Sequence, residues 1–278
     1  MKFARIGEAG REIPVALAED HYVDLSALTD DIDGAFLSQP LEDVAATVRS
    51  GGLPRIPREG QRVGAPIARP SAVVCVGMNY AAHAAESGAK PPEDLVVFLK
   101  TPNTVTGPEE ELRIPPGSER TDWEVELGVV IGRRASYLGS PEEALGHVAG
   151  YTLVNDVSER EWQLERSGGQ WGKGKSFPGF SPVGPWLVTA DEVDPGDLRL
   201  RSWVNGAPRQ DSRTSDMIFD VVQIVWRLSQ FLVLEPGDLV MTGTPEGVAL
   251  SGRFPYLRPG DVVEVAIDGL GRQRQAVR

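Results

Sequence analysis

The chain has 278 residues, which is enough for one large domain, or for one domain with a small appendage, and for a sizeable buried core. Its formal net charge is -12, with 40 Asp and Glu residues against 28 Lys and Arg residues. This charge disfavours nucleic acid and an anionic membrane surface as partners, so an anionic substrate would need a local positive site made by a metal, lysine or arginine.

The first 65 residues are predicted to form a small β-rich N-terminal module. Short alternating stretches at 13–18 and 22–25 are mixed with acidic and small residues, and a linker containing Pro and Gly follows at 54–66. The N-terminus lacks the apolar core of a signal peptide, and no stretch is apolar for long enough to span a bilayer. The only cysteine, Cys75, cannot form an internal disulfide and lies in an apolar run typical of a buried strand, so we expect a cytoplasmic protein.

Residues 70–278 are predicted to form a second, larger domain with many strands and few helices. Three Pro-Gly-Asp triplets, beginning at Pro195, Pro236 and Pro259, each precede an apolar or alternating run, which predicts a tight turn followed by a strand. The clearest helix is expected over residues 216–231 behind Ser215 as a possible N-cap, because apolar residues recur there at helical spacing. A shorter helix is expected from residue 79 to about residue 87. The predicted fold class is α+β with β predominating.

The segment Asp122-Trp-Glu-Val-Glu-Leu-Gly is the most informative part of the sequence. In a strand, Glu124 and Glu126 point to the same face while Val125 points to the other. Two carboxylates on one face repel unless a positive charge lies between them, and the apolar run that follows indicates a buried location where this repulsion is costly. A solvated strand face would show the same alternation, so a cation site and a surface strand both remain open on this pattern alone.

Asp156 is the next acidic candidate, because it ends the run Tyr151-Thr-Leu-Val-Asn-Asp, where a predicted strand gives way to a polar segment. Three carboxylates without a nearby cysteine or a cluster of histidines suggest an all-oxygen site. Such a site favours Mg²⁺, Mn²⁺ or Ca²⁺ over Zn²⁺ or copper. The competing interpretation is that Asp156 caps a following helix.

His83 and Glu86 lie three residues apart in the predicted short helix, so they share a face and can form a hydrogen bond. Glu86 could orient the imidazole and make it more basic, which would suit His83 to act as a general base toward water. The surrounding alanines are expected to leave the pair exposed on a lightly packed helix. A surface histidine with an incidental ion-pair partner is the alternative.

Two turn-rich loops could reach a ligand. One contains Lys175, which a rigid loop could bring to a substrate carboxylate or to a developing oxyanion. It lacks the glycine spacing and the following helix of a Walker phosphate loop, so a nucleotide site is rejected. The other contains Thr244, whose hydroxyl and backbone amide could donate to a ligand, although an ordinary turn at a strand end would also explain it.

Five ordered motifs together resemble the fumarylacetoacetate hydrolase family over a region from about residue 70 to the C-terminus. They are Gly77-Met-Asn-Tyr-Ala-Ala-His-Ala-Ala-Glu, Asp122-Trp-Glu-Val-Glu-Leu, Tyr151-Thr-Leu-Val-Asn-Asp-Val-Ser, Lys173-Gly-Lys-Ser and Gly243-Thr-Pro-Glu-Gly-Val. The resemblance implies a mixed β-roll catalytic domain in a homodimer. It implies Mg²⁺ or Mn²⁺, for which Ca²⁺ could substitute, at positions that match Glu124, Glu126 and Asp156.

The resemblance also implies roles for further residues. His83 and Glu86 match the family's catalytic dyad on a lid that orders over the substrate. The positions of Arg160, Gln163, Lys175 and Thr244 match substrate contacts, and Lys175 is also expected to act in catalysis. Many relatives carry a polar residue, often Asp, where this chain has Pro178, which leaves the exact substrate open.

The implied activity is that of a divalent-metal-dependent hydrolase. It would cleave a carbon–carbon bond in a small anionic 2,4-dioxo acid, an acylpyruvate or a sugar-acid derivative, through a metal-bound enolate. The serious alternative is a decarboxylase, isomerase or lyase of the oxaloacetate, 2-hydroxydienoate or ureidoglycolate type at the same site. A non-catalytic metal-binding or ligand-binding protein is a third hypothesis, but it would leave the pairing of His83 and Glu86 unexplained.

Overall fold

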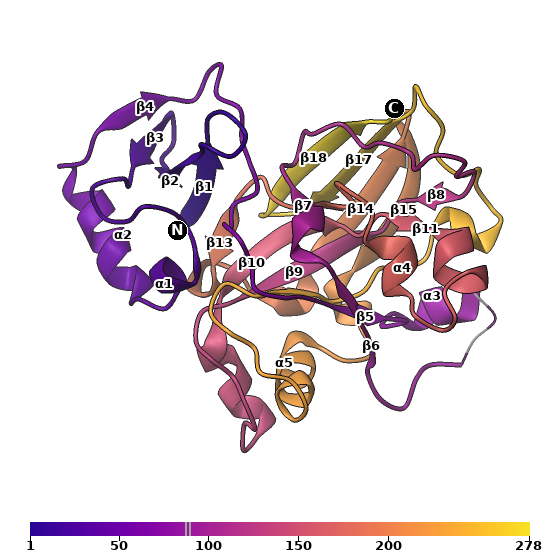
Figure 1. Ribbon diagram of the computed structural model, residues 1–278. Coiled ribbons are helices and arrows are strands. Elements are labelled where there is room, and N and C mark those ends of the chain that lie inside the picture. Colours follow the sequence, from indigo (N-terminus) through magenta and orange to yellow (C-terminus); the bar gives the residue numbers. More distant parts are fainter. Residues whose placement is uncertain (87, 89) are drawn as a thin grey trace.

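The N-terminal part of the chain forms four strands and two helices at one end of the molecule (Figure 1). The computed structural model describes residues 1–86, 88 and 90–278. The N-terminal elements are β1 (Lys2–Ile6), β2 (Ile13–Leu17), β3 (His21–Asp24), α1 (Gly34–Leu37), α2 (Leu41–Ser50) and β4 (Arg55–Pro57). The sequence patterns indicated β2 and β3 but not β1 or either helix, and β4 lies in the segment that was expected to be a linker.

The N-terminal strands join a ten-stranded sheet that runs through the molecule in the order β4-β3-β2-β1-β13-β10-β9-β16-β5-β6. β1 pairs with β13 in antiparallel orientation, so the sheet continues into the C-terminal part. The predicted domain boundary between residues 65 and 70 therefore stays a prediction. The remaining strands of this sheet are β5 (Val73–Gly77), β6 (Val96–Lys100), β9 (Val125–Ile131), β10 (Val148–Asn155), β13 (Leu187–Thr189) and β16 (Leu239–Met241).

A second, four-stranded sheet packs against the central strands of the first. Its order is β15-β14-β17-β18, with β14 (Arg199–Val204), β15 (Ala207–Arg213), β17 (Val262–Ile267) and β18 (Gly271–Ala276). Val125 and Leu127 on one face of β9 share a hydrophobic cluster with Leu200 and Val265 of the second sheet. Because side chains alternate along a strand, Glu124 and Glu126 point to the opposite face. The core between the sheets thereby fixes which face of β9 carries the carboxylates.

The remaining strands are short pairs. β7 (Val105–Thr106) pairs with β12 (Ser181–Pro182), and β8 (Thr121–Asp122) pairs with β11 (Ser158–Glu159). Strands β14, β16 and β17 follow the Pro-Gly-Asp triplets at Pro195, Pro236 and Pro259, as predicted. The second and third triplets form turns, whereas the first forms a short 3-10 helix. The fold class, α+β with β predominating, is confirmed as well.

Helices in the C-terminal part are few and short. The α-helices are α3 (Ala81–Glu86), α4 (Gly172–Lys175) and α5 (Val221–Ser229). A π-helix, η3, spans Glu161–Glu165, and the 3-10 helices are η1 (Pro102–Thr104), η2 (Pro141–His147), η4 (Ala190–Glu192), η5 (Pro195–Asp197), η6 (Thr214–Asp216) and η7 (Ala249–Ser251). Within the described residues, no helix is both long and apolar enough to cross a membrane.

The boundaries of two predicted helices differ from the structure. Helix α5 begins at Val221 rather than at residue 216, and its N-cap is Asp220, whose carboxylate accepts a hydrogen bond from the Gln223 amide. The amides of Ile218 and Phe219 donate instead to the main chain and side chain of Asn79, which holds this segment in a non-helical conformation. The shorter predicted helix corresponds to α3, and Ser87, at its predicted end, lies outside the described residues.

Candidate active site

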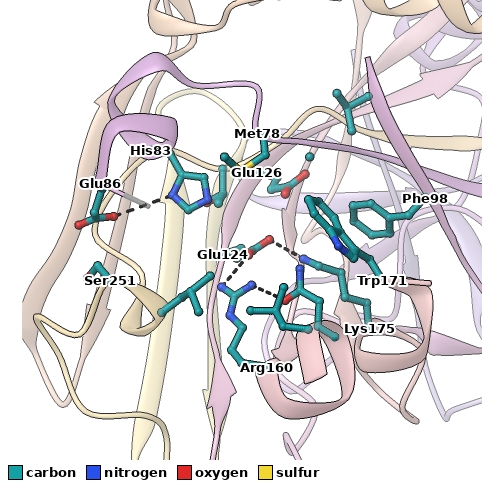
Figure 2. Close-up of a pocket in the computed structure, with 16 residues that line it drawn as sticks. Met78, His83, Glu86, Phe98, Glu124, Glu126, Arg160, Trp171, Lys175 and Ser251 are labelled. Carbon is teal, nitrogen blue, oxygen red and sulfur yellow. Dashed lines mark hydrogen bonds and ion pairs between the residues drawn. The ribbon is translucent and has the colours of Figure 1, made fainter. Parts of the chain in front are cut away.

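A pocket of about 380 Å³ lies where β5, β6 and β9 meet helices α3 and α4 (Figure 2). This volume is at the small end of the range for small-molecule sites, which is roughly 300–1,000 Å³. The residues predicted from the sequence that line it are His83, Glu86, Glu124, Glu126, Arg160, Gln163, Lys175 and Thr244. Asp156 lies behind this lining, fully buried, and contacts Lys175.

The three predicted carboxylates converge in this site. Glu124, Glu126 and Asp156 each place a carboxylate oxygen within 4.8 Å of the others. The antiparallel pairing of β9 with β10 brings them together, because Asn155 lies opposite Val125 and the Asp156 amide donates to the Glu124 carbonyl oxygen at 2.8 Å. All three are buried, which rules out a solvated strand face. The Asp156 carboxylate accepts hydrogen bonds from Lys100 and Lys175, so it is not a helix cap.

Three cationic side chains surround these carboxylates. Lys175 Nζ donates to Glu124 Oε2 and to Asp156 Oδ2, each at 2.7 Å. Arg160 Nη2 lies 2.7 Å from Glu124 Oε1 and 2.8 Å from Asp122 Oδ2. Every charge in this group is at least nine-tenths buried, so each one depends on its partners rather than on water.

Lys100 is the third cation and was missed in the sequence. Its Nζ donates to Asp156 Oδ1 at 2.5 Å and to the Phe180 carbonyl oxygen at 2.6 Å, and its side chain is fully buried. The available signal was a lysine that directly follows the apolar run Val96-Val-Phe-Leu in β6. Since Lys100 and Lys175 each hold one oxygen, the plane of the Asp156 carboxylate is fixed from two sides.

The electrostatics separate the two glutamates. Burial alone would raise the pKa of Glu124, but Lys175 and Arg160 lower it to about 2. The pKa of Glu126 is raised well above its ordinary value, first by burial and then by the negative charges of Asp156 and Glu124. The Gly243 amide donates to Glu126 Oε2 at 2.8 Å, which is weak compensation for a buried charge. Glu126 is therefore the carboxylate that most needs a further cation.

The residues present fit a hard divalent cation. The donor set consists of carboxylate oxygens, which are the ligands that Mg²⁺, Mn²⁺ and Ca²⁺ prefer. Four buried carboxylates, those of Asp122, Glu124, Glu126 and Asp156, face the three cations Lys100, Lys175 and Arg160. With all four carboxylates ionised, one negative charge is left over, and the raised pKa of Glu126 means that either a proton or a further cation neutralises it there.

His83 is buried, with 6% of its surface exposed, and the prediction of an exposed pair on a lightly packed helix was wrong. Its Nδ1 lies 3.9 Å from Glu86 Oε2, which is too long for the expected hydrogen bond. Glu86 accepts instead from the Gly247 amide and from Arg253, each at 3.0 Å. Among the described residues, His83 Nδ1 is buried without a hydrogen-bond partner.

The pKa of His83 is lowered chiefly by burial, which outweighs the raising effect of the Glu124 and Glu86 carboxylates, and the positive charges of Arg160 and Lys175 add smaller lowering contributions. The imidazole is therefore neutral at pH 7 and can accept a proton. Figure 2 shows it facing the pocket opposite the aromatic rings of Phe98 and Trp171, with Glu124 between them. This position suits a base that acts on a molecule held near the carboxylates.

The remaining predicted residues have partners inside the site. Arg160 Nη1 donates to Gln163 Oε1 at 2.8 Å. The Thr244 hydroxyl donates to the Val125 carbonyl oxygen at 2.9 Å and accepts from Gln210. Their proposed contacts with substrate stay predictions. Pro178 is exposed and does not belong to the residues that line the pocket.

Several lining residues had not been singled out in the sequence because they are apolar and carry no chemical signature. Phe98 and Trp171 form an aromatic pair with ring centroids 5.9 Å apart. Met78, Leu164 and Leu250 complete an apolar wall. Only the folded arrangement distinguishes them from ordinary core residues.

Comparison with known proteins gives consistent matches. Residues 72–278 match the family model described as fumarylacetoacetate (FAA) hydrolase C-terminal. A Burkholderia ambifaria protein named "Putative hydrolase BamMC406_5393" is 46% identical, with coverage of 100% of this chain and 99% of the relative.

Solved structures that match over the whole chain include the following two. A 5-carboxymethyl-2-hydroxymuconate delta-isomerase from Mycobacterium smegmatis is 33% identical with a TM-score of 0.80, over 100% of this chain and 99% of that one. A maleylpyruvate hydrolase from Sphingobium sp. SYK-6, in complex with manganese (II) ion and pyruvate, is 28% identical with a TM-score of 0.82, over 100% and 98% of the two chains. The manganese in that relative and the acidic triad of this chain both favour binding of a divalent cation.

Proposed function

Because this chain belongs to the fumarylacetoacetate hydrolase family, we propose that it is a divalent-metal-dependent enzyme that hydrolyses a carbon–carbon bond in a small 2,4-dioxo acid. The observation that carries the proposal is the buried triad of Glu124, Glu126 and Asp156 beside the neutral imidazole of His83. The cation would be Mg²⁺ or Mn²⁺, and Ca²⁺ could substitute for it.

The charge balance supports a substrate with one carboxylate near the cation. The four buried carboxylates and three buried cations leave one negative charge, so a divalent cation would make the site positive by one. A single substrate carboxylate would then neutralise it. Buried charges that lack a partner are costly, and a monoanionic head group therefore fits this site better than a neutral or doubly charged one.

When bound, the cation would supply positive charge next to the 1-carboxylate and 2-oxo group and so favour enolate formation in the substrate. His83 would take a proton from the water that attacks the carbonyl carbon at position 4. The bond between carbons 3 and 4 then breaks, and carbon 3 is protonated to give pyruvate or an analogue, while the acyl part leaves as a carboxylic acid.

Lys175 and Gln163 would steady the oxygens that become negative in this reaction. The ammonium of Lys175 has three N–H donors, and Glu124 and Asp156 take two of them. The third remains for a substrate oxygen. Gln163 presents its amide beside Arg160, whose donation to Gln163 Oε1 leaves the amide N–H groups for a ligand. Glu86 would act through its charge near His83 rather than through a direct hydrogen bond.

An isomerase or decarboxylase at the same site is the second candidate, and the isomerase from Mycobacterium smegmatis is the observation that favours it. The reactions differ in whether water is added. Hydrolysis of an acylpyruvate releases pyruvate and a carboxylic acid, decarboxylation of oxaloacetate releases carbon dioxide, and tautomerisation of a 2-hydroxydienoate changes only the ultraviolet spectrum.

The test uses the purified protein with Mn²⁺ or Mg²⁺ and measures pyruvate release from acetylpyruvate alongside the other two reactions. His83→Ala should reduce hydrolysis by roughly 10²–10⁴-fold, which is the usual contribution of general acid–base catalysis. His147→Ala is the matched control, since His147 lies outside the pocket. Full hydrolysis in the presence of a chelator, or in His83→Ala, would refute the proposal.

A further inference from the structure

The two cationic side chains among the described residues that line the pocket are already engaged at its carboxylate end. Lys175 contacts Glu124 and Asp156, and Arg160 contacts Glu124 together with Asp122. Arg253 lies outside this lining, with a side chain that is 61% exposed, and pairs with Glu86. A second substrate carboxylate would therefore find no unengaged cation in the described wall of the pocket.

Six lining residues form an apolar surface in the pocket: Val76, Met78, Phe98, Leu164, Trp171 and Leu250. Besides His83, the uncharged polar residues of the lining are Gln163, Thr244 and Ser251. Lys175 Nζ lies 5.0 Å from the centre of the Phe98 ring, so the aromatic wall begins where the cationic end of the pocket stops. Figure 2 shows Phe98 and Trp171 together on the side of the pocket across from His83. A molecule whose head group is held by the carboxylate cluster has to lay its tail against this surface.

Gly77 leaves the space that the Trp171 ring occupies in this wall. Gly77 ends strand β5, and a Cβ atom at this position would lie 2.5 Å from Trp171 Cζ3. Only a glycine allows the indole ring to approach the strand so closely. Trp171 also directly precedes helix α4, which carries Lys175, so the ring and the ammonium are positioned by one short segment.

We propose that the substrate carries an uncharged, apolar tail, either alkyl or aryl, and that its only carboxylate is the one next to the 2-oxo group. This inference rests on the proposed function, which accounts for the head group alone. Phe98, Trp171, Met78 and Leu164 select the tail by burying it, and a second carboxylate is excluded because it would lose its hydration without gaining a cation.

The test is calorimetric binding of unreactive 2-oxo acids to the wild-type protein loaded with Mn²⁺. The affinity should rise from pyruvate through 2-oxobutanoate and 2-oxopentanoate to 2-oxohexanoate by up to about fourfold for each methylene, from about 0.8 kcal/mol per buried CH₂. 2-Oxopentanedioate, which is similar in length to 2-oxohexanoate but has a second carboxylate, should bind at least about tenfold more weakly than 2-oxohexanoate.

The same ligands test a variant that places a cation in the wall. Leu164 is half-exposed at the pocket, and Leu164→Arg should shift the preference toward 2-oxopentanedioate by about tenfold or more. Leu99→Arg is the matched control, because Leu99 is equally accessible but does not line the pocket, and it should keep the wild-type order.

The outcomes separate this inference from the proposed function. Pyruvate has no tail, so a failure of metal-dependent pyruvate binding would overturn the proposed function and this inference with it. Pyruvate binding combined with a wild-type preference for 2-oxopentanedioate would overturn the apolar tail alone. An unchanged preference in Leu164→Arg would likewise overturn the assignment of this wall to the tail.

Discussion

Replacing Glu126 by glutamine should remove the stabilisation by metal while preserving the metal-free fold. Glu126 is 2% exposed, and its raised pKa means that its carboxyl group holds a proton more readily than an ordinary glutamate does. Glutamine is a neutral side chain of the same shape, and its carbonyl oxygen can keep the hydrogen bond from the Gly243 amide. The melting temperature of the metal-free Glu126→Gln variant should therefore equal or exceed that of the metal-free wild type.

The expected magnitude follows from mass action. A cation at 100 times its Kd stabilises the folded state by about 2.7 kcal/mol. For a chain of 278 residues, this corresponds to a rise in melting temperature of roughly 5 °C. Loss of a carboxylate that weakens binding by about 100-fold leaves only about 0.4 kcal/mol at the same concentration, which is a rise of about 1 °C.

Differential scanning calorimetry with and without Mn²⁺ measures both quantities. Glu159→Gln is the matched control, because Glu159 is a fully buried carboxylate that binds Ser118 and the Trp162 amide rather than the cluster. This control should keep the full metal-induced shift, whatever its own stability. A full shift in Glu126→Gln, or a large loss of metal-free stability on that substitution, would refute the reasoning.

Three further predictions concern other residues of the site. Lys100→Met should lower the free energy of unfolding by about 3–5 kcal/mol in urea titrations, because it leaves Asp156 Oδ1 buried beside an apolar side chain. Lys173→Met, at an exposed position, should change the free energy of unfolding little, and equal effects of the two substitutions would contradict the role of Lys100. The pKa of His83 is lowered from 6.5, and only the neutral imidazole accepts a proton, so kcat/KM should fall only below pH 6.5, as His83 becomes protonated. A fall in kcat/KM that begins above pH 6.5 and is absent in His83→Ala would disprove this assignment. Gly77→Ala should displace Trp171, which should change the intrinsic fluorescence and weaken the binding of 2-oxohexanoate more than that of pyruvate. Gly146→Ala, where an added Cβ meets open space, should have none of these effects. An unaltered preference for 2-oxohexanoate in Gly77→Ala would contradict the role of Gly77 in positioning Trp171.

The carboxylate cluster was predictable because two local rules apply to it. The two-residue period of a strand places Glu124 and Glu126 on one face, and the apolar residues between and after them identify the buried face. Asp156 could be recognised as a strand end. The register that brings it to Glu124 is set by the pairing of β9 with β10 and is not encoded in the residues near Asp156.

Errors in the prediction arose where distant contacts decide the outcome. Neighbouring alanines suggested that His83 is exposed, but the side chain is buried because α3 packs over the pocket near Glu124. The start of α5 was misplaced because Asn79, about 140 residues away, takes the amides of Ile218 and Phe219. Lys100 resembled an ordinary strand terminus, since its partner Asp156 lies 56 residues further along the chain.

The roles of the site residues and the identity of the substrate stay predictions for a simple physical reason, and the homodimer stays a prediction as well. The chemistry of a carboxylate cluster depends on the molecule that completes it, so hydrolysis, decarboxylation and isomerisation are all compatible with this one. Sedimentation of the purified protein would test the homodimer independently of its activity.

Anomalous diffraction from a crystal soaked in Mn²⁺ is the most direct test of the proposed cation site. It should reveal one peak with oxygens of Glu124, Glu126 and Asp156 at about 2.0–2.6 Å, and Lys175 displaced from at least one of the two carboxylates it now bridges. A peak elsewhere, or an ion held without Glu126, would contradict the central claim that these three buried side chains form one cation site.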